Sequence, residues 1–584
     1  MWHRKLERYP SARQRYRYLA ITVLSTVVAY YELYIHGAVA TMIIGEFDLT
    51  FTQYVMISVI GTLLGAFASL AAGLADRWGR ANLVTIGLFV TSSLVRFGMP
   101  QAANATTYAL YFAGLSIVEG MILVATPALI RDFSPQWGRA SAMGFWTFGP
   151  VLGSLLVTAI SSNTLASHPD WQFQFRLCGT IGLATAVVAL LGLRELSPAL
   201  RDQLMISLRD RALIEARAAG IDRRRAYDSH WRQVLKPDVL VSSVAISVYL
   251  VFYYISVGFF VVYFSTVFGY TEARANALAN WYWASTAVAL VVSGLLSDKL
   301  RVRKPFMVVG ALLSAGAVTM FRRLTTEPDP GSAVPFFTCL TPGSDTRYYV
   351  LASVLVIIGV GTGLTYCAWM ACFTEAVERH NPAATATGLA LWAWINRIIV
   401  TVALAAFTIM LPAASTLVDQ GHHLKELTTE YREQLETLRA LEPSTVIAIE
   451  AYVPSAQAIT AATTELVNSG VAADAMAARA RIQQLRTQPV PLLDQQFIRD
   501  EAAAVAQAEQ DNPAQWQRWW LVCAGAQLAF VPLIFIMGGR WRPKRAREDA
   551  ARHEAYIEKE LRKLARTGNA RPSGPRTGRC RQYR

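Results

Sequence analysis

Charged residues are scarce in this chain. They make up 16% of its 584 residues, whereas a soluble protein of this size carries about a quarter. Hydrophobic residues make up 53%, and they gather into long runs separated by short charged links. Runs of this length match membrane-spanning helices. The composition therefore predicts an all-α integral membrane protein.

The sequence also lacks the motifs of enzymes and of ATP-driven pumps. Its six cysteines are scattered along the chain, and no Cys or His residues are spaced like the ligands of a metal site. There is no nucleotide-binding loop, catalytic triad or metal motif. We therefore expect no enzyme activity, no cofactor and no metal.

The long apolar runs divide the chain into membrane spans. Each run is close to the length that a helix needs to cross about 30 Å of hydrocarbon. The twelve expected spans are residues 18–44, 51–73, 82–100, 107–130, 142–161, 176–193, 238–263, 274–297, 306–322, 348–374, 388–411 and 517–538. An even number of spans places both termini on one side of the membrane.

The net charge of +14 comes largely from basic residues that flank the spans. They cluster before the first span, in the central loop and after the last span. Because such residues hold loops in the cytoplasm, we expect a plasma-membrane protein with both termini inside, and no nucleic-acid partner. A further role of this charge in binding lipid or a protein stays open.

One segment between spans is unusually long. About one hundred residues separate the last two spans, where a short hairpin would suffice. Leucines from Leu424 to Leu441 recur at three- and four-residue steps, which is typical of an amphipathic helix. We expect a small helical unit outside the membrane that acts as a structural cap, a lid or a docking site for an envelope partner.

These features divide the chain into seven parts. They are the basic N-terminus (1–17), the first six-helix half (18–193), the central loop (194–237), spans 7–11 (238–411), the insertion (412–516), span 12 (517–538) and the basic tail (539–584).

Two related motifs lie in matching links of the two halves. The first is Ala72-Gly73-Leu74-Ala75-Asp76-Arg77-Trp78-Gly79-Arg80, and the second is Gly294-Leu295-Leu296-Ser297-Asp298-Lys299. Both resemble the Gly-x-Leu-Ala-Asp-Arg-x-Gly-Arg signature of the major facilitator superfamily of secondary transporters. The first copy departs from it at Ala72, and the second has Arg301 where the later glycine belongs.

The resemblance implies a fold and a mechanism. The fold is twelve helices in two six-helix halves, which rock about a site near the middle of the membrane. In that family spans 1, 4, 7 and 10 line the central cavity. The resemblance also gives a gating role to the motif residues Asp76, Arg77, Arg80, Asp298 and Lys299, for which a plain topology anchor is the alternative.

Ionisable residues near the middle of a span are costly, which makes them functional candidates. Glu32 lies near the middle of span 1, with His36 four residues later on the same helix face. Glu119 lies near the middle of span 4. Asn396 and Arg397 are adjacent in span 11.

Each of these groups has a functional and a structural interpretation. Burial favours the neutral form of a carboxyl group, so Glu32 and Glu119 could each carry a proton, or only tie helices together. His36 could contact substrate or only bond a neighbour. Arg397 keeps its charge and needs an anionic substrate or a carboxylate partner, unless it is a structural arginine. Five aromatic side chains could face the cavity and suit a substrate with an apolar or ring portion, or could simply pack: Tyr30, Tyr34, Tyr254, Tyr366 and Trp369.

The expected function is proton-coupled symport of a small organic solute, either an anion or a polar metabolite. Subfamily hints conflict, because Gly149–Ser154 resembles an element of drug–proton antiporters, whereas Glu195–Pro198 echoes an element of sugar and metabolite porters. Proton-driven export of drugs or amphiphilic compounds is therefore one alternative. A receptor or scaffold that binds a partner through the outer insertion is another.

Overall fold

The computed structural model describes residues 5–70, 79–133, 139–197, 235–300, 302–325, 346–380, 385–450 and 454–538, and a few residues between 540 and 555. Over these ranges the chain is almost entirely helical, which confirms the predicted all-α class. The one sheet in the described chain pairs β1 (Lys5–Leu6) in parallel with β2 (Glu195–Leu196). Of the described helices, eleven are long and apolar enough to cross a membrane.

The first half of the bundle contains six long helices. Five of them are among these eleven, and the sixth, α7, brings the number to the expected twelve. It packs against α1 and, across the interface between the halves, against α13. The elements of this half are α1 (Ala12–Ala38), α2 (Ala40–Glu46), α3 (Phe51–Leu70), α5 (Arg80–Ser93), η1 (Leu94–Gly98), η2 (Met99–Gln101), α6 (Ala105–Phe133), α7 (Arg139–Thr164) and α8 (Trp171–Gly192).

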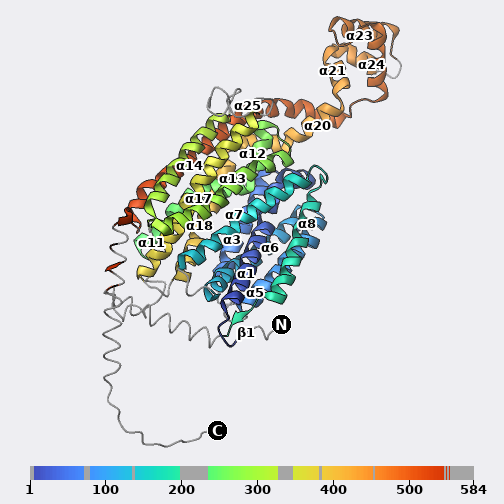
Figure 1. The fold of residues 1–584 in the computed structure, drawn as a ribbon. Coiled ribbons are helices and arrows are strands. Elements are labelled where there is room, and N and C mark those ends of the chain that lie inside the picture. Colours follow the sequence, from blue (N-terminus) through green and yellow to red (C-terminus); the bar gives the residue numbers. More distant parts are fainter. Residues whose placement is uncertain are drawn as a thin grey trace, which may run out of the picture.

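The second half repeats this arrangement. Its helices are α11 (Pro237–Tyr249), α12 (Val251–Phe268), α13 (Glu272–Leu300), α14 (Lys304–Leu324), α17 (Thr346–His380), α18 (Thr385–Met410) and α25 (Leu492–Ile536). Figure 1 shows the two halves side by side, with the N-terminus and β1 at one end of the bundle. We call this the terminal end, and the opposite end, where the insertion projects, the insertion end.

Two expected spans are each formed by two helices. Span 1 breaks at Val39, between α1 and α2, and span 7 breaks at Leu250, between α11 and α12. Near the first break the halves touch closely: a Cβ atom on Gly37 would lie 2.4 Å from the backbone oxygen of Val257. Glycine is needed at this position because any side chain would push α1 away from α12.

Hydrogen bonds join the two halves near the insertion end. Thr41 Oγ1 donates to Glu272 Oε1 over 2.9 Å, and the Asn276 side-chain amide donates to the Ala38 backbone oxygen over 3.0 Å. Deeper in the bundle, Thr158 Oγ1 donates to Asn280 Oδ1 over 2.6 Å. In this conformation the halves are therefore held together at the insertion end.

The insertion is built from α19 (Pro412–Thr416), η5 (Leu417–Gly421), α20 (His422–Glu430), α21 (Arg432–Ala440), α22 (Pro443–Glu450), α23 (Ala456–Asn468), α24 (Ala475–Thr487) and the first part of α25. Its α21, α23 and α24 form a head that projects away from the bundle on a stalk of α20 and α25 (Figure 1). The expected border between residues 516 and 517 lies inside α25, whose 45 residues run from the stalk to the far side of the bundle without a break.

The predicted leucine stripe serves two separate hydrophobic clusters. Leu424 and Leu427 pack in the stalk with Ile498 and Val505 of α25, whereas Leu441 belongs to the core of the head. Tyr431 and Leu435 also pack in the stalk, whereas Leu438 packs against the head, so the stripe divides within α21.

Candidate functional site

A cavity of about 170 Å³ lies between the two halves. This volume corresponds to on the order of ten water molecules, which suits a small solute. Helices α1, α3, α6 and α7 of the first half line it, together with α12, α17 and α18 of the second half. Its polar side chains include His36, Ser58, Thr62, Ser69, Ser116, Glu119, Asn396 and Arg397.

Glu119 and Arg397 are the charged pair of this cavity. Glu119 on α6 is 1% exposed, and neither of its carboxylate oxygens has a hydrogen-bond partner. Arg397 on α18 donates instead to the backbone oxygen of Gly65, which belongs to α3 of the other half. The two groups therefore share one cavity without a direct bond between them.

A close helix crossing positions these two groups. A Cβ atom on Gly120 would lie 2.4 Å from the Gly65 backbone oxygen, so α3 and α6 approach each other through their glycines. Glu119 directly precedes Gly120, and the same Gly65 oxygen accepts the hydrogen bond from Arg397. The crossing thus brings the arginine of one half beside the carboxyl group of the other.

The other polar group of α18 is also fixed in place. The Asn396 side-chain amide donates to the Tyr254 hydroxyl over 2.8 Å, which joins α18 to α12 inside the second half. Tyr254, Tyr30, Tyr34 and Tyr366 all line the cavity, as the sequence suggested. They give it an aromatic wall with hydroxyl groups.

Trp369 does not line the cavity, so its assignment there is corrected. Its side chain is fully buried, and its indole nitrogen donates to Ser242 Oγ over 2.9 Å. It stacks behind Tyr366 with 6.3 Å between ring centroids. Two tryptophans that the sequence analysis did not select, Trp146 of α7 and Trp392 of α18, line the cavity from opposite halves and meet edge to face at 6.4 Å.

Glu32 and His36 face different surroundings, which corrects the expectation of a shared cavity face. His36 lines the cavity, and its Nδ1 lies 2.8 Å from the Leu33 backbone oxygen. Glu32 is fully buried among α1, α5 and α8, where Ser92 Oγ donates to Oε1 over 2.5 Å and Gly182 leaves room for the carboxylate. Four helical residues rotate by about 400°, so the two side chains differ by about 40° in direction.

The motif region forms ion pairs at the terminal end of each half. Asp76 and Arg77 lie outside the described residues. Arg80 pairs with Asp132 at the end of α6 over 2.8 Å. Arg80 is the first residue of α5, where the Glu195 carboxylate accepts a hydrogen bond from the Ala81 backbone N–H over 3.3 Å.

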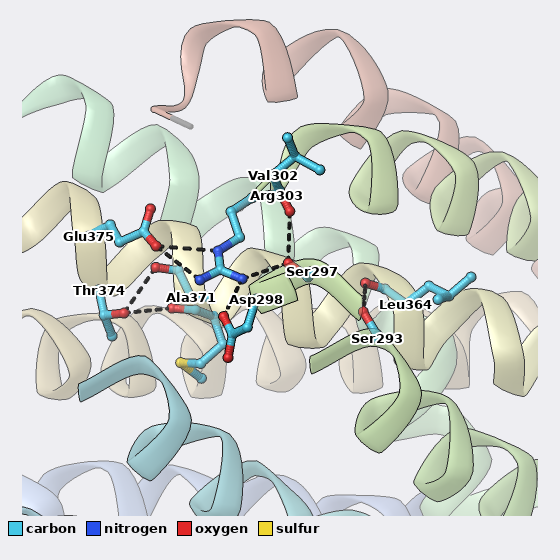
Figure 2. Close-up of polar contacts among 10 residues, drawn as sticks. Ser293, Ser297, Asp298, Val302, Arg303, Leu364, Ala371, Thr374 and Glu375 are labelled. Atoms are coloured by element: carbon cyan, nitrogen blue, oxygen red, sulfur yellow. Dashed lines mark hydrogen bonds and ion pairs between the residues drawn. The ribbon is translucent and has the colours of Figure 1, made fainter. Parts of the chain in front are cut away.

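The second half has a matching arrangement, drawn in Figure 2. Arg303 pairs with Asp298 over 2.7 Å and with Glu375 of α17 over 3.2 Å, and it also donates to Ser297 Oγ. Burial lowers the pKa of the Arg303 guanidinium, but the Glu375 and Asp298 carboxylates outweigh burial, so its pKa lies above the ordinary value. Lys299 is exposed. The sequence analysis did not select Arg303 as a site residue, although it directly follows the second motif.

A family model and several known proteins match this chain. Residues 22–403 match the family model described as Major Facilitator Superfamily. Among curated proteins, the chain is 27% identical over 375 residues to the "Probable nitrate/nitrite transporter NarK2" of Mycobacterium tuberculosis, covering 63% of this chain and 82% of that protein. It is 24% identical over 314 residues to "Sugar phosphate exchanger 3" of Xenopus laevis, covering 48% and 59%.

Two solved structures are similar to this chain at low sequence identity, and the first of them shows the same fold. The proton:xylose symporter XylE bound to 6-bromo-6-deoxy-D-glucose is 13% identical, with a TM-score of 0.51, over 70% of this chain and 91% of that one. A bacterial homologue of the human lysosomal transporter Spinster, inward-facing and occupied, is 18% identical, with a TM-score of 0.49, over 86% and 98%. With a family model that matches most of the chain, this multi-pass membrane protein is a transporter, not an enzyme, and belongs to the major facilitator superfamily.

Proposed function

We propose that the protein is a secondary active transporter that moves a small anionic solute together with a proton, by alternating access. One observation carries the proposal: Arg397 and Glu119 line the same cavity between the halves, and no bond joins them. A fixed positive charge in a nonpolar setting is costly unless an anion approaches it. A substrate anion would supply that partner.

Glu119 accounts for the coupling to protons. Glu119 is almost fully buried, and neither of its oxygens has a hydrogen-bond partner, so a bound proton would remove a charge that no hydrogen bond stabilises. As the cavity faces one side and then the other, this carboxyl group can take up a proton on one side and release it on the other. Glu32 is assigned a structural role, because Ser92 donates to its Oε1 and the side chain does not line the cavity, although its Oε2 has no hydrogen-bond partner.

The relatives favour an anion over a neutral solute. The curated proteins are named for nitrate or nitrite and for sugar phosphate, all of which are anions. A cavity of about 170 Å³ suits the smaller members of this group, such as inorganic oxyanions and short carboxylates. We place the protein in the plasma membrane, with both termini in the cytoplasm and the insertion outside, because basic residues flank the spans at the terminal end.

A binding experiment tests the role of Arg397. Purified protein is titrated with nitrate, nitrite, phosphate and short carboxylates, with xylose as a neutral comparison, and the melting temperature is recorded. At least one anion should stabilise the wild type and the control Arg518→Gln, which changes an exposed arginine of α25. The same anion should not stabilise Arg397→Gln. Equal stabilisation of both variants would reject the proposal that Arg397 binds the anion.

A further inference from the structure

The base of the insertion makes a contact that reaches into the other half. After α18 ends, the chain continues through α19 into η5, which carries Asp419. The Phe51 backbone N–H donates to Asp419 Oδ1 over 2.6 Å. Phe51 is the first residue of α3. Asp419, which follows α18 of the second half, therefore caps a helix of the first half.

This cap fills a position that α3 leaves open. A reciprocal pair already serves its N-terminus, since Thr50 N–H donates to Gln53 Oε1 over 2.9 Å and Gln53 N–H donates to Thr50 Oγ1 over 3.1 Å. These bonds do not involve the Phe51 N–H, which would be an unsatisfied donor of the first turn. A carboxylate at a helix N-terminus also interacts favourably with the helix dipole.

The carboxylate is held from its own side as well. Ser415 Oγ donates to Asp419 Oδ2 over 3.0 Å, which orients the side chain. The Ala413 backbone N–H donates to Gln515 Oε1 of α25 over 2.9 Å, so the base of the insertion is tied to α25. The contact is therefore between a segment anchored on the second half and the end of a helix in the first half.

We infer that the base of the insertion, α19 and η5, is a latch that holds the insertion end of the transporter closed. The hydrogen bond from Phe51 of α3 to Asp419 is the contact that holds it. The Phe51 ring packs against Phe259 and Phe407 of the second half at the same point. Opening of the insertion end separates α3 from the second half, so the bond between Asp419 and Phe51 must break at this step. The insertion thus sets how often the cavity opens on its side.

The inference rests on the proposed alternating access, and it is tested without any substrate. Spin labels are placed on cysteines at Ala166, between α7 and α8, and at Thr271, before α13, in protein without its native cysteines. Both positions are exposed and lie at the insertion end of opposite halves. Pulsed electron resonance then measures the distance between the labels in detergent and in lipid nanodiscs.

The wild type should show mainly the short distance of the closed state. Asp419→Ala should add a longer distance and raise the ratio of open to closed molecules about tenfold, as expected for the loss of one helix cap. Glu426→Ala removes an exposed carboxylate of α20 and should match the wild type. A distance distribution in Asp419→Ala that equals that of Glu426→Ala overturns the inference.

A second variant covers the case in which Asp419→Ala does not fold. Asp419→Asn keeps an oxygen that can accept from Phe51 N–H but removes the charge, so it should raise the open fraction by a smaller factor. No change in Asp419→Asn would then reject the latch. Failure of anion binding in the melting experiment, with an altered distance distribution here, would reject the proposed substrate and leave the latch standing.

Discussion

Glu119 provides the sharpest test of proton coupling. We predict that Glu119→Gln abolishes accumulation of the anion against its gradient while exchange of anion across the membrane continues. The substitution keeps the shape of the side chain and removes only the proton site. Because both oxygens of Glu119 lack hydrogen-bond partners, the change breaks no existing bond in the protein.

The size of the effect follows from the driving force. One pH unit across the membrane is worth about 1.4 kcal/mol for each proton, which is about tenfold in concentration. A transporter that moves one proton with one monovalent anion should therefore accumulate the anion about tenfold per pH unit. The Gln variant should reach a ratio of about one at the same gradient.

The assay uses proteoliposomes that are loaded at one pH and diluted into buffer of another pH. The labelled anion is the one that stabilises the protein in the melting experiment. Counterflow with equal pH on both sides measures exchange separately. Glu32→Gln is the matched control, because Glu32 is an equally buried carboxyl group of the same half that does not line the cavity. Normal tenfold accumulation by Glu119→Gln would refute the reasoning, and loss of accumulation in Glu32→Gln alone would move the proton site to Glu32.

Three further predictions follow from packing, charge and topology. Gly182→Ala should lower the melting temperature strongly, since its Cβ would lie 1.9 Å from the Glu32 carboxylate. The control Gly525→Ala, whose Cβ would meet nothing within 4 Å, should not. Equal melting temperatures of the two variants would contradict the buried placement of Glu32. Arg303→Gln should slow turnover in counterflow several-fold and leave anion affinity unchanged, because the ion pairs of Arg303 lie at the terminal end and not in the cavity. Weakened anion binding with normal turnover would count against a gating role. A cysteine at the exposed Gln457, with the native cysteines removed, should react with an impermeant thiol reagent in intact cells; reaction only after permeabilisation would reverse the proposed topology.

The architecture could be predicted because it depends on coarse properties of the chain. Length and spacing of apolar runs determine which segments can cross a membrane. The two motifs mark the repeat, and in the second half Asp298 lies in the last turn of α13, shortly before α14 begins at Lys304. The break at Val39 was not predicted, because no proline interrupts the apolar run of residues 18–44.

The cavity was predictable only in part. Glu119 and Arg397 were found because charge is rare inside a span, and both line the cavity. Glu32 carries the same signal, yet it points between helices of its own half, because the direction of a side chain depends on how the whole helix is rotated. Trp146 and Trp392 were missed because a tryptophan in an apolar run is usually a packing residue, and no sequence signal distinguishes the two uses.

The charges of the cavity suggest why proton and anion would move together. With Arg397 charged and Glu119 ionised, the two side chains sum to zero, and they again sum to zero when a proton and a monovalent anion are both bound. A proton alone or an anion alone would leave one net charge in a site shielded from water, where a single charge interacts strongly and is poorly compensated. The two neutral states are therefore the ones that can cross the closed conformation at low cost. Coupling then requires no direct contact between the proton and the anion, and it follows from placing one arginine and one glutamate on opposite halves of the same small cavity.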